Sequence, residues 1–166
     1  RQLLFQLIVS KRWRLKLGDI KGAFLSAGDL PPQYRPLYAR LPAGGIPGVP
    51  EDALIEVVGH VYGLNDSPSA WYRKLSSVLL SAGFEKSRYD SCLFYMREGN
   101  ELTGVYGVHV DDCATGGHGE KYEKGLKFLQ ENFEFRKWRD GLQGGDFCGA
   151  SYTQDASSGE ITMSQS

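Results

Sequence analysis

The stretch Val108-His109-Val110-Asp111-Asp112 ends an apolar, β-branched run with two adjacent carboxylates. The residues before it, Val105-Tyr106-Gly107, are rich in strand formers, and those after it are small and turn-prone. This pattern predicts a β-hairpin with both aspartates at its tip. Side-by-side carboxylates repel each other, and Mg²⁺ relieves that repulsion because it prefers hard oxygen ligands. A solvated Asp-Asp turn is the plainer interpretation, but Asp19, far upstream, is a second carboxylate in a similar setting.

The composition is that of an ordinary globular domain. The chain has 166 residues, of which 41% are hydrophobic and 23% charged, enough for one domain with a core. Its three cysteines, Cys92, Cys113 and Cys148, are odd in number and lack metal-ligand spacing, which favours reduced thiols and a cytosolic-type compartment. No apolar run reaches membrane-spanning length and no signal peptide is visible.

The net charge of -1 argues against a self-sufficient nucleic-acid binder, because such proteins normally present a basic surface. The first residue is Arg rather than Met, so we expect a piece of a longer protein.

Hydrophobic periodicity predicts three helices: the end of one over Leu3–Ile8, one from Ser67 to about Gly83, and one over Glu120–Asn132. Strands are expected over the remaining patterned segments, with a proline-rich loop from Ala27 to Pro50. The strand segments are 12–17, 37–41, 53–58, 91–96, 102–110, 135–138, 146–152 and 160–163. This order predicts an α+β fold, a mostly antiparallel sheet with helices packed on one face.

Three blocks, in this order, resemble the reverse transcriptase of copia-type retrotransposons. The first, Leu17-Gly18-Asp19-Ile20-Lys21-Gly22-Ala23-Phe24-Leu25, is similar to the family's Asp-Val-Lys-x-Ala-Phe-Leu. The second, Val61 to Tyr72, is similar to its Leu-Tyr-Gly-Leu-Lys-Gln-x-Pro-x-Ala-Trp-Tyr. The third runs from Tyr89-Asp90-Ser91-Cys92-Leu93-Phe94 into Val108–Asp112, where the family has Tyr-Val-Asp-Asp. Phe133-Glu134-Phe135 and Phe147-Cys148-Gly149 also sit where the family shows a similar pattern.

The resemblance implies a polymerase palm with part of the fingers, which adds deoxynucleotides to a primer 3′-hydroxyl on an RNA template. It implies two Mg²⁺ or Mn²⁺ ions held by the catalytic carboxylates Asp19, Asp111 and Asp112, with Ile20 counted among the metal-binding positions. It also implies substrate-binding positions, with Phe24 screening the sugar 2′-position of the incoming nucleotide. These positions are Ile20, Lys21, Gly22, Ala23, Phe24, Tyr62, Gly63 and His109. Without the resemblance, Phe24 is better interpreted as a core residue.

Several features depart from the family pattern. His109 replaces the family's Tyr, Asn65-Asp66 replaces a Lys-Gln pair, and Ser69 stands where a basic residue is frequent, so positive charge that would meet phosphates is lost. By resemblance, the basic finger strands precede residue 1, and the thumb and RNase H follow Ser166. The expected partners are an RNA/DNA template-primer, dNTP and the rest of the polyprotein including integrase. The expected location is a cytoplasmic or nuclear retroelement particle.

Two alternatives remain at this point. A catalytically inactive retroelement fragment or interaction module could keep the motifs after losing activity. A metallohydrolase could instead use His109, Asp111, Asp112 and His118, but neither His60 nor any cysteine supplies further ligands convincingly. Zinc preference would favour the hydrolase, and Mg²⁺ or Mn²⁺ preference the polymerase.

Overall fold

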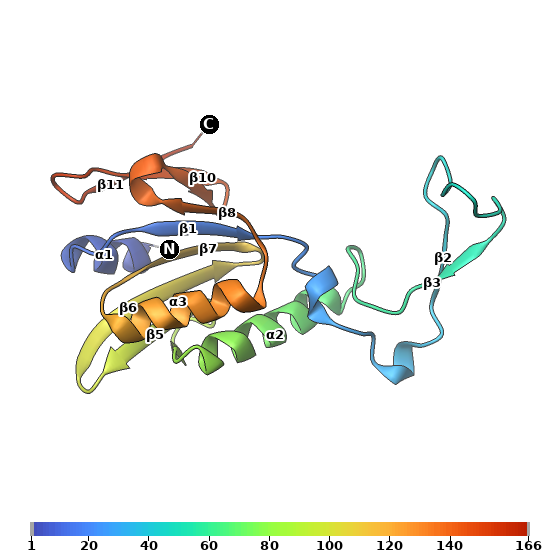
Figure 1. The fold of residues 1–166 in the computed structure, drawn as a ribbon, viewed down its shortest axis with the longest axis horizontal. Coiled ribbons are helices and arrows are strands. Elements are labelled where there is room, and N and C mark those ends of the chain that lie inside the picture. Colours follow the sequence, from blue (N-terminus) through green and yellow to red (C-terminus); the bar gives the residue numbers. More distant parts are fainter. Residues whose placement is uncertain (1, 166) are drawn as a thin grey trace. The chain divides into compact units, whose positions relative to one another are not determined.

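A six-stranded antiparallel sheet forms the centre of the larger of two units in the computed structural model, which describes residues 2–165. This unit comprises Arg1–Gly22 and Arg73–Ser166, and the smaller one Ala23–Tyr72; each is described by itself. The strand order is β4-β5-β6-β7-β1-β8. All of these strands except β4 are labelled in Figure 1. The strands are β1 Lys16–Ile20, β4 Glu85–Lys86, β5 Leu93–Glu98, β6 Glu101–His109, β7 Asp112–Gly117 and β8 Phe135–Asp140.

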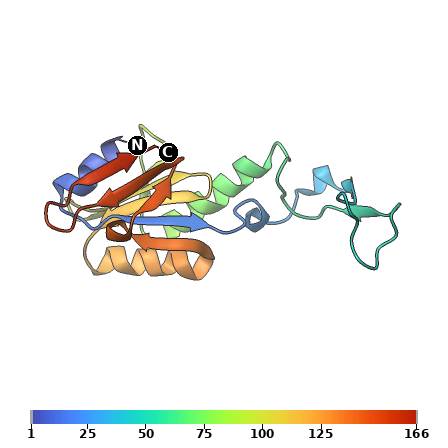
Figure 2. The ribbon, with the colours of Figure 1, turned by 90° about the horizontal axis from the view of Figure 1, so that it is seen from above.

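Helices cover both faces of this sheet, not one. Helix α3 (Glu120–Asn132) lies on one side, while α1 (Gln2–Ser10) lies on the other together with a three-stranded sheet (Figure 2). The small sheet has the order β11-β10-β9, formed by Ile161–Ser164, Ala150–Gln154 and Gly145–Phe147. The antiparallel α+β fold is confirmed, but the expectation of helices on one face only was wrong.

Glycines on the central strands explain how both faces are covered so closely. A Cβ on Gly117 would lie 2.6 Å from a ring carbon of Tyr122 in α3. A Cβ on Gly116, which faces the opposite side because successive strand residues alternate, would lie 2.8 Å from Ile8 in α1. Each helix therefore approaches the backbone where a side chain is missing, and α1 extends a core that includes Leu17 and Phe147.

The smaller unit is mostly loop, as the prolines predict. It contains the 3-10 turns η1 (Leu25–Ala27) and η2 (Pro32–Tyr34) and a two-stranded sheet of β2 (Tyr38–Arg40) and β3 (Leu54–Glu56). Helix α2 (Ser67–Ser81) begins in this unit and continues into the larger one. At its start the Ser67 hydroxyl donates to the Val61 carbonyl at 2.8 Å, so this fully buried side chain fastens the preceding turn.

Most strand bounds differ from the sequence expectation by one or two residues, and β4 and β7 lie outside the expected strand segments. Two differences are larger. The segment 146–152 is not one strand, because Cys148 and Gly149 have φ values of 53° and 73° and form a turn between β9 and β10. Strand β1 starts at Lys16, four residues later than expected, after Arg12 with its φ of 54°. Within residues 2–165, no helix has the length and apolar character needed to cross a membrane.

Candidate active site

Asp19 and Asp112 face each other across neighbouring antiparallel strands. Asp19 is on β1, and its Cα partner on β7 is Asp112. Directly opposite residues on paired strands project from the same face of the sheet, so the two carboxylates share one side. The resemblance assigns Asp19 and the Asp-Asp hairpin to one metal site, and the strand pairing places Asp19 directly opposite Asp112.

The third carboxylate lies in the tight turn that joins β6 to β7. Val110, with a φ of 56°, and Asp111 form this turn, and His109 and Asp112 close it as a cross-strand pair. A β-branched residue at positive φ is strained, so the turn is held by other contacts. One of them is the hydrogen bond from the Ile20 amide to the Asp111 carbonyl at 2.8 Å, which fastens the hairpin tip to β1.

The carboxylate oxygens at this end of the sheet have few hydrogen-bond partners. Asp19 Oδ1 is buried without any partner in the described chain, and Asp19 Oδ2 lies 3.6 Å from Arg136 Nε. Asp112 Oδ2 accepts a hydrogen bond from the Cys148 amide at 3.2 Å. Because buried polar atoms are normally paired, the unpartnered oxygen of Asp19 marks a place where a further group can bind.

The electrostatic environment of Asp112 disfavours its charge. Partial burial raises the pKa of this carboxyl, and the negative charges of Asp111 and Asp19 raise it further. The Cys148 amide and His109 act in the opposite direction without cancelling the rise. A divalent cation would reverse this balance, because it favours the ionised form of every carboxyl around it.

The two facing aspartates open onto a cavity of about 180 Å³ that mixes both signs of charge. Lys137 and Arg139 of β8 line it, and Asp146 of β9 adds a further carboxylate. The sequence reasoning missed these residues as well as Arg136. The available signal was the cluster of cations in the 135–140 strand, but its position beside Asp19 depends on strand pairing.

A divalent metal fits these donors chemically. Aspartate oxygens are the hard ligands that Mg²⁺ and Mn²⁺ prefer, and Asp19 Oδ1 lacks any other partner in residues 2–165. Within the same residues, no three His, Cys, Asp or Glu side chains converge on one point as a ready-made cluster. The arrangement is thus a facing pair, Asp19 and Asp112, with Asp111 in the adjoining turn.

The structure divides the expected substrate-binding positions between the two units. In the larger one, Ile20 is buried, Lys21 Nζ pairs with Glu134 Oε1 at 2.8 Å, and Gly22 has a φ of 60°. His109 is exposed and lines a second cavity, of about 250 Å³, together with Cys92 and Cys148.

The remaining positions belong to the smaller unit. Ala23 is buried, and the rings of Phe24 and Tyr62 are 4.8 Å apart at an interplanar angle of 57°. Tyr62 is exposed and Gly63 has a φ of 94°. Phe24 is half-buried and packs against an exposed ring, so it is not a fully enclosed core residue.

The structure places His118 too far away to serve as the fourth ligand of the metallohydrolase alternative. His118 follows the far end of β7, about 20 Å along the strand from Asp112 at about 3.3 Å per residue. There its Nε2 lies 3.4 Å from Glu101 Oε1. The metal cluster that this interpretation requires is therefore not formed.

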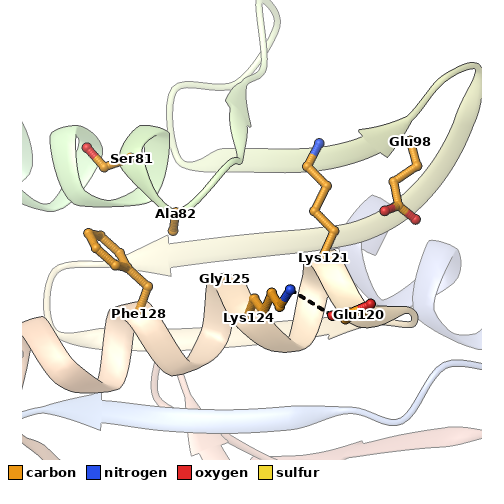
Figure 3. A pocket seen from close by; sticks show the side chains of 8 residues that line it. All are labelled: Ser81, Ala82, Glu98, Glu120, Lys121, Lys124, Gly125 and Phe128. Atoms are coloured by element: carbon orange, nitrogen blue, oxygen red, sulfur yellow. Dashed lines mark ion pairs between the residues drawn. The ribbon is translucent and has the colours of Figure 1, made fainter.

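A cavity of about 430 Å³ lies between the end of α2, the end of β5 and helix α3 (Figure 3). Its lysines already have partners, because Lys121 Nζ donates to the Arg97 carbonyl at 2.6 Å and Lys124 Nζ pairs with Glu120 at 2.7 Å. It contains none of the expected site residues, so the carboxylate pair remains the candidate site.

Comparison with known proteins found a matching family and two similar plant proteins. The family model described as "Reverse transcriptase (RNA-dependent DNA polymerase)" matches residues 1–166. The chain is 28% identical over 140 residues, 84% of its length, to the "Retrovirus-related Pol polyprotein from transposon RE2" of Arabidopsis thaliana. It is 29% identical over 117 residues, 70% of its length, to the corresponding polyprotein from transposon RE1 of the same plant.

The chain therefore belongs to the reverse transcriptase (RNA-dependent DNA polymerase) family. Within it, the similarity to the Arabidopsis Pol polyproteins confirms the resemblance to the copia-type retrotransposon enzymes. The matched segments span 9% and 8% of these two relatives, so the chain corresponds to a small part of such a polyprotein. Reverse transcriptases in general use divalent metals, which agrees with the chemistry of the carboxylate pair.

Proposed function

We propose that this chain is the palm, with part of the fingers, of an RNA-directed DNA polymerase from a copia-type retrotransposon. The reaction would be the transfer of a nucleotide from dNTP to a primer 3′-hydroxyl on an RNA template. The single observation that carries the proposal is the cross-strand pair of Asp19 and Asp112, with Asp111 in the adjoining turn, in a chain of this family.

In this proposal Asp19, Asp111 and Asp112 hold the metals, with Ile20 contributing through its backbone. The facing strands support such a role, because they hold two short carboxylates on one side of a sheet with little freedom to move apart. When bound, two divalent ions supply activation of the attacking hydroxyl and stabilisation of the leaving pyrophosphate. The site's own contribution is to fix the carboxylates before the substrate arrives.

The other positions have roles in holding the substrate. Phe24, packed on Tyr62, screens the sugar 2′-position, and Lys21, Gly22, Ala23 and Gly63 keep the backbone near the nucleotide. His109, beside Asp112 in the hairpin, contacts the primer end in place of the family's Tyr. The partners are a template-primer, dNTP and the remaining parts of the Pol polyprotein.

A primer-extension assay on an RNA template tests the proposal. We expect Mg²⁺- or Mn²⁺-dependent extension from the chain within its full polyprotein, and loss of extension on changing Asp111→Asn. Absence of extension from the full polyprotein with intact flanks would support the inactive-fragment alternative instead.

The isolated 166 residues should bind Mn²⁺ weakly and extend a primer barely or not at all. Positioning of the reactants contributes about 7–11 kcal/mol in ideal cases, and by resemblance most of it comes from fingers and thumb. Processive synthesis by the isolated chain would show that those flanks are dispensable.

A further inference from the structure

Arg136 is the residue of β8 that interrupts the regular pairing with β1. Asp19 pairs with Lys137 and Ile20 pairs with Phe135, so Arg136 is an extra residue with no Cα partner on β1. Such β-bulges re-aim a side chain and are frequent beside active sites. Here the bulge coincides with the ion pair between Arg136 Nε and Asp19 Oδ2 at 3.6 Å.

The contact is loose and can be released. At 3.6 Å it is an ion pair rather than a hydrogen bond, and the Arg136 side chain is 56% exposed, while that of Asp19 is 21% exposed. The neighbouring cation Lys137 lies opposite Asp19 and lines the same cavity, yet it forms no ion pair with it within residues 2–165. The Arg136 guanidinium, rather than the Lys137 ammonium, is therefore the ion-pair partner of Asp19.

We propose that Arg136 is a positioning residue that serves as the counter-ion of Asp19 in the metal-free chain and yields this carboxylate when a divalent metal binds. This inference rests on the metal site of the proposed function. Without Arg136, Asp19 would lose its ion-pair partner among residues 2–165, while Lys137 and Arg139 would remain in the same cavity. With it, the guanidinium keeps Asp19 ordered but competes with the metal, so it lowers metal affinity.

Mn²⁺ binding to the 166-residue chain, followed by electron paramagnetic resonance, tests this competition. We expect Arg136→Gln to tighten Mn²⁺ binding by about two- to fivefold, the range for a partly exposed ion pair. The matched control is Lys137→Gln, which removes the same charge from the next residue on the strand. We expect it to have a smaller effect, and in an Asp19→Asn background the effect of Arg136→Gln should disappear.

A second measurement observes Arg136 directly. In the ¹⁵N-labelled wild-type chain, the Nε–Hε resonance of Arg136 should shift as Mg²⁺ is added, and it should stay unchanged in Asp19→Asn.

The outcomes separate this inference from the proposed function. Three results would overturn the role of Arg136 while leaving the metal site intact. They are equal tightening of Mn²⁺ binding by both Gln variants, weaker Mn²⁺ binding in Arg136→Gln, and an Nε–Hε resonance that does not shift when Mg²⁺ is added. Absence of any Asp19-dependent Mn²⁺ binding in all variants would overturn the metal site itself and the inference with it.

Discussion

Asp112 and Asp155 are carboxylates of one chain whose surroundings act on their charge in opposite directions. In the loop between β10 and β11, Asp155 Oδ1 accepts four hydrogen bonds of 2.6–3.0 Å from the backbones and hydroxyls of Ser157 and Ser158. These bonds hold the pKa of Asp155 well below its usual range. Burial and neighbouring carboxylates raise the pKa of Asp112 instead.

Asp155 has a structural role in its loop, whereas Asp112 and Asp19 have the unsatisfied carboxylates expected of a ligand-binding site. Asp155 is satisfied by its own chain, so it needs nothing further. At the other site, Asp19 Oδ1 is buried without a partner in the described chain, and Asp112 accepts one hydrogen bond from Cys148. Neighbouring carboxylates that repel each other and lack hydrogen-bond partners reduce the stability of the fold. A cluster of such groups is typical of functional sites.

The largest expected difference between the two regions is in catalysis. In the full polyprotein, Asp112→Asn should reduce primer extension by at least about a hundredfold, the loss typical of removing one group that stabilises developing charge. The same change at Asp155 should leave extension unchanged, because its oxygen acts only within its loop. Steady-state primer-extension rates of both variants measure this difference. Similar losses of rate in the two variants would show that Asp112 has no special role in catalysis.

The close packing around Asp19 predicts a second difference. A Cβ on the preceding Gly18 would lie 2.7 Å from a ring carbon of Trp138 and 2.9 Å from the Cys113 sulfur. Gly18→Ala should therefore lower the free energy of unfolding by about 1–3 kcal/mol, the usual cost of overpacking. Gly59→Ala, whose Cβ would come no closer than 3.4 Å to a neighbour, is the control. Urea unfolding measures both, and equal losses would contradict the argument.

Local patterns sufficed for much of this fold. The bounds of α3 coincide with those predicted, since its apolar residues recur at helical spacing and Glu120 and Glu123 lie in its first turn. The hairpin of β6 and β7 was also predictable, but of the two aspartates only Asp111 lies in its turn: Asp112 begins β7, which runs through the residues expected to be turn-prone. The side of the sheet taken by α1 was not, because it depends on Gly107 and Gly116 meeting Leu4 and Ile8, contacts between distant segments.

The candidate site shows the same division. Nothing in the spacing of the residues brought Asp19 and Asp112 together. The family resemblance assigned both to one metal site, and the strand register places them opposite each other. Arg136 remained hidden because a bulge arises from the pairing of two strands rather than from one of them. The Cys148 amide was missed for a related reason, since its turn at positive φ carries a non-glycine residue that sequence rules do not favour there.

In stability, the two carboxylates should respond with opposite signs to the same substitution. At neutral pH and without metal, Asp112→Asn should raise the free energy of unfolding by about 0.5 kcal/mol after allowance for solvent screening. The amide keeps an oxygen that can accept from the Cys148 amide, so mainly the charge is lost. Asp155→Asn should destabilise the chain, because hydrogen bonds to a charged acceptor are stronger. Matched urea midpoints measure both, and destabilisation by both changes would contradict the comparison.

The smallest effect is in the pH dependence of these differences, and its sign follows from the two pKa shifts. The folded-state pKa of Asp112 is raised from 3.8, so its stabilising contribution is present below about pH 4 and is lost as pH rises through the raised pKa. The free energy of unfolding of the wild type minus that of Asp112→Asn should therefore fall with rising pH above about pH 4.

The pKa of Asp155 is lowered, so its contribution is present above about pH 4 and is lost as pH falls. The wild type minus Asp155→Asn should accordingly rise with pH up to about pH 4 and then stay level. Urea unfolding of the three chains across this range, without divalent metal, measures both curves. If both stability differences changed with pH in the same direction, the surroundings of Asp112 would already stabilise its charge. Asp112 would then have no need of a bound cation.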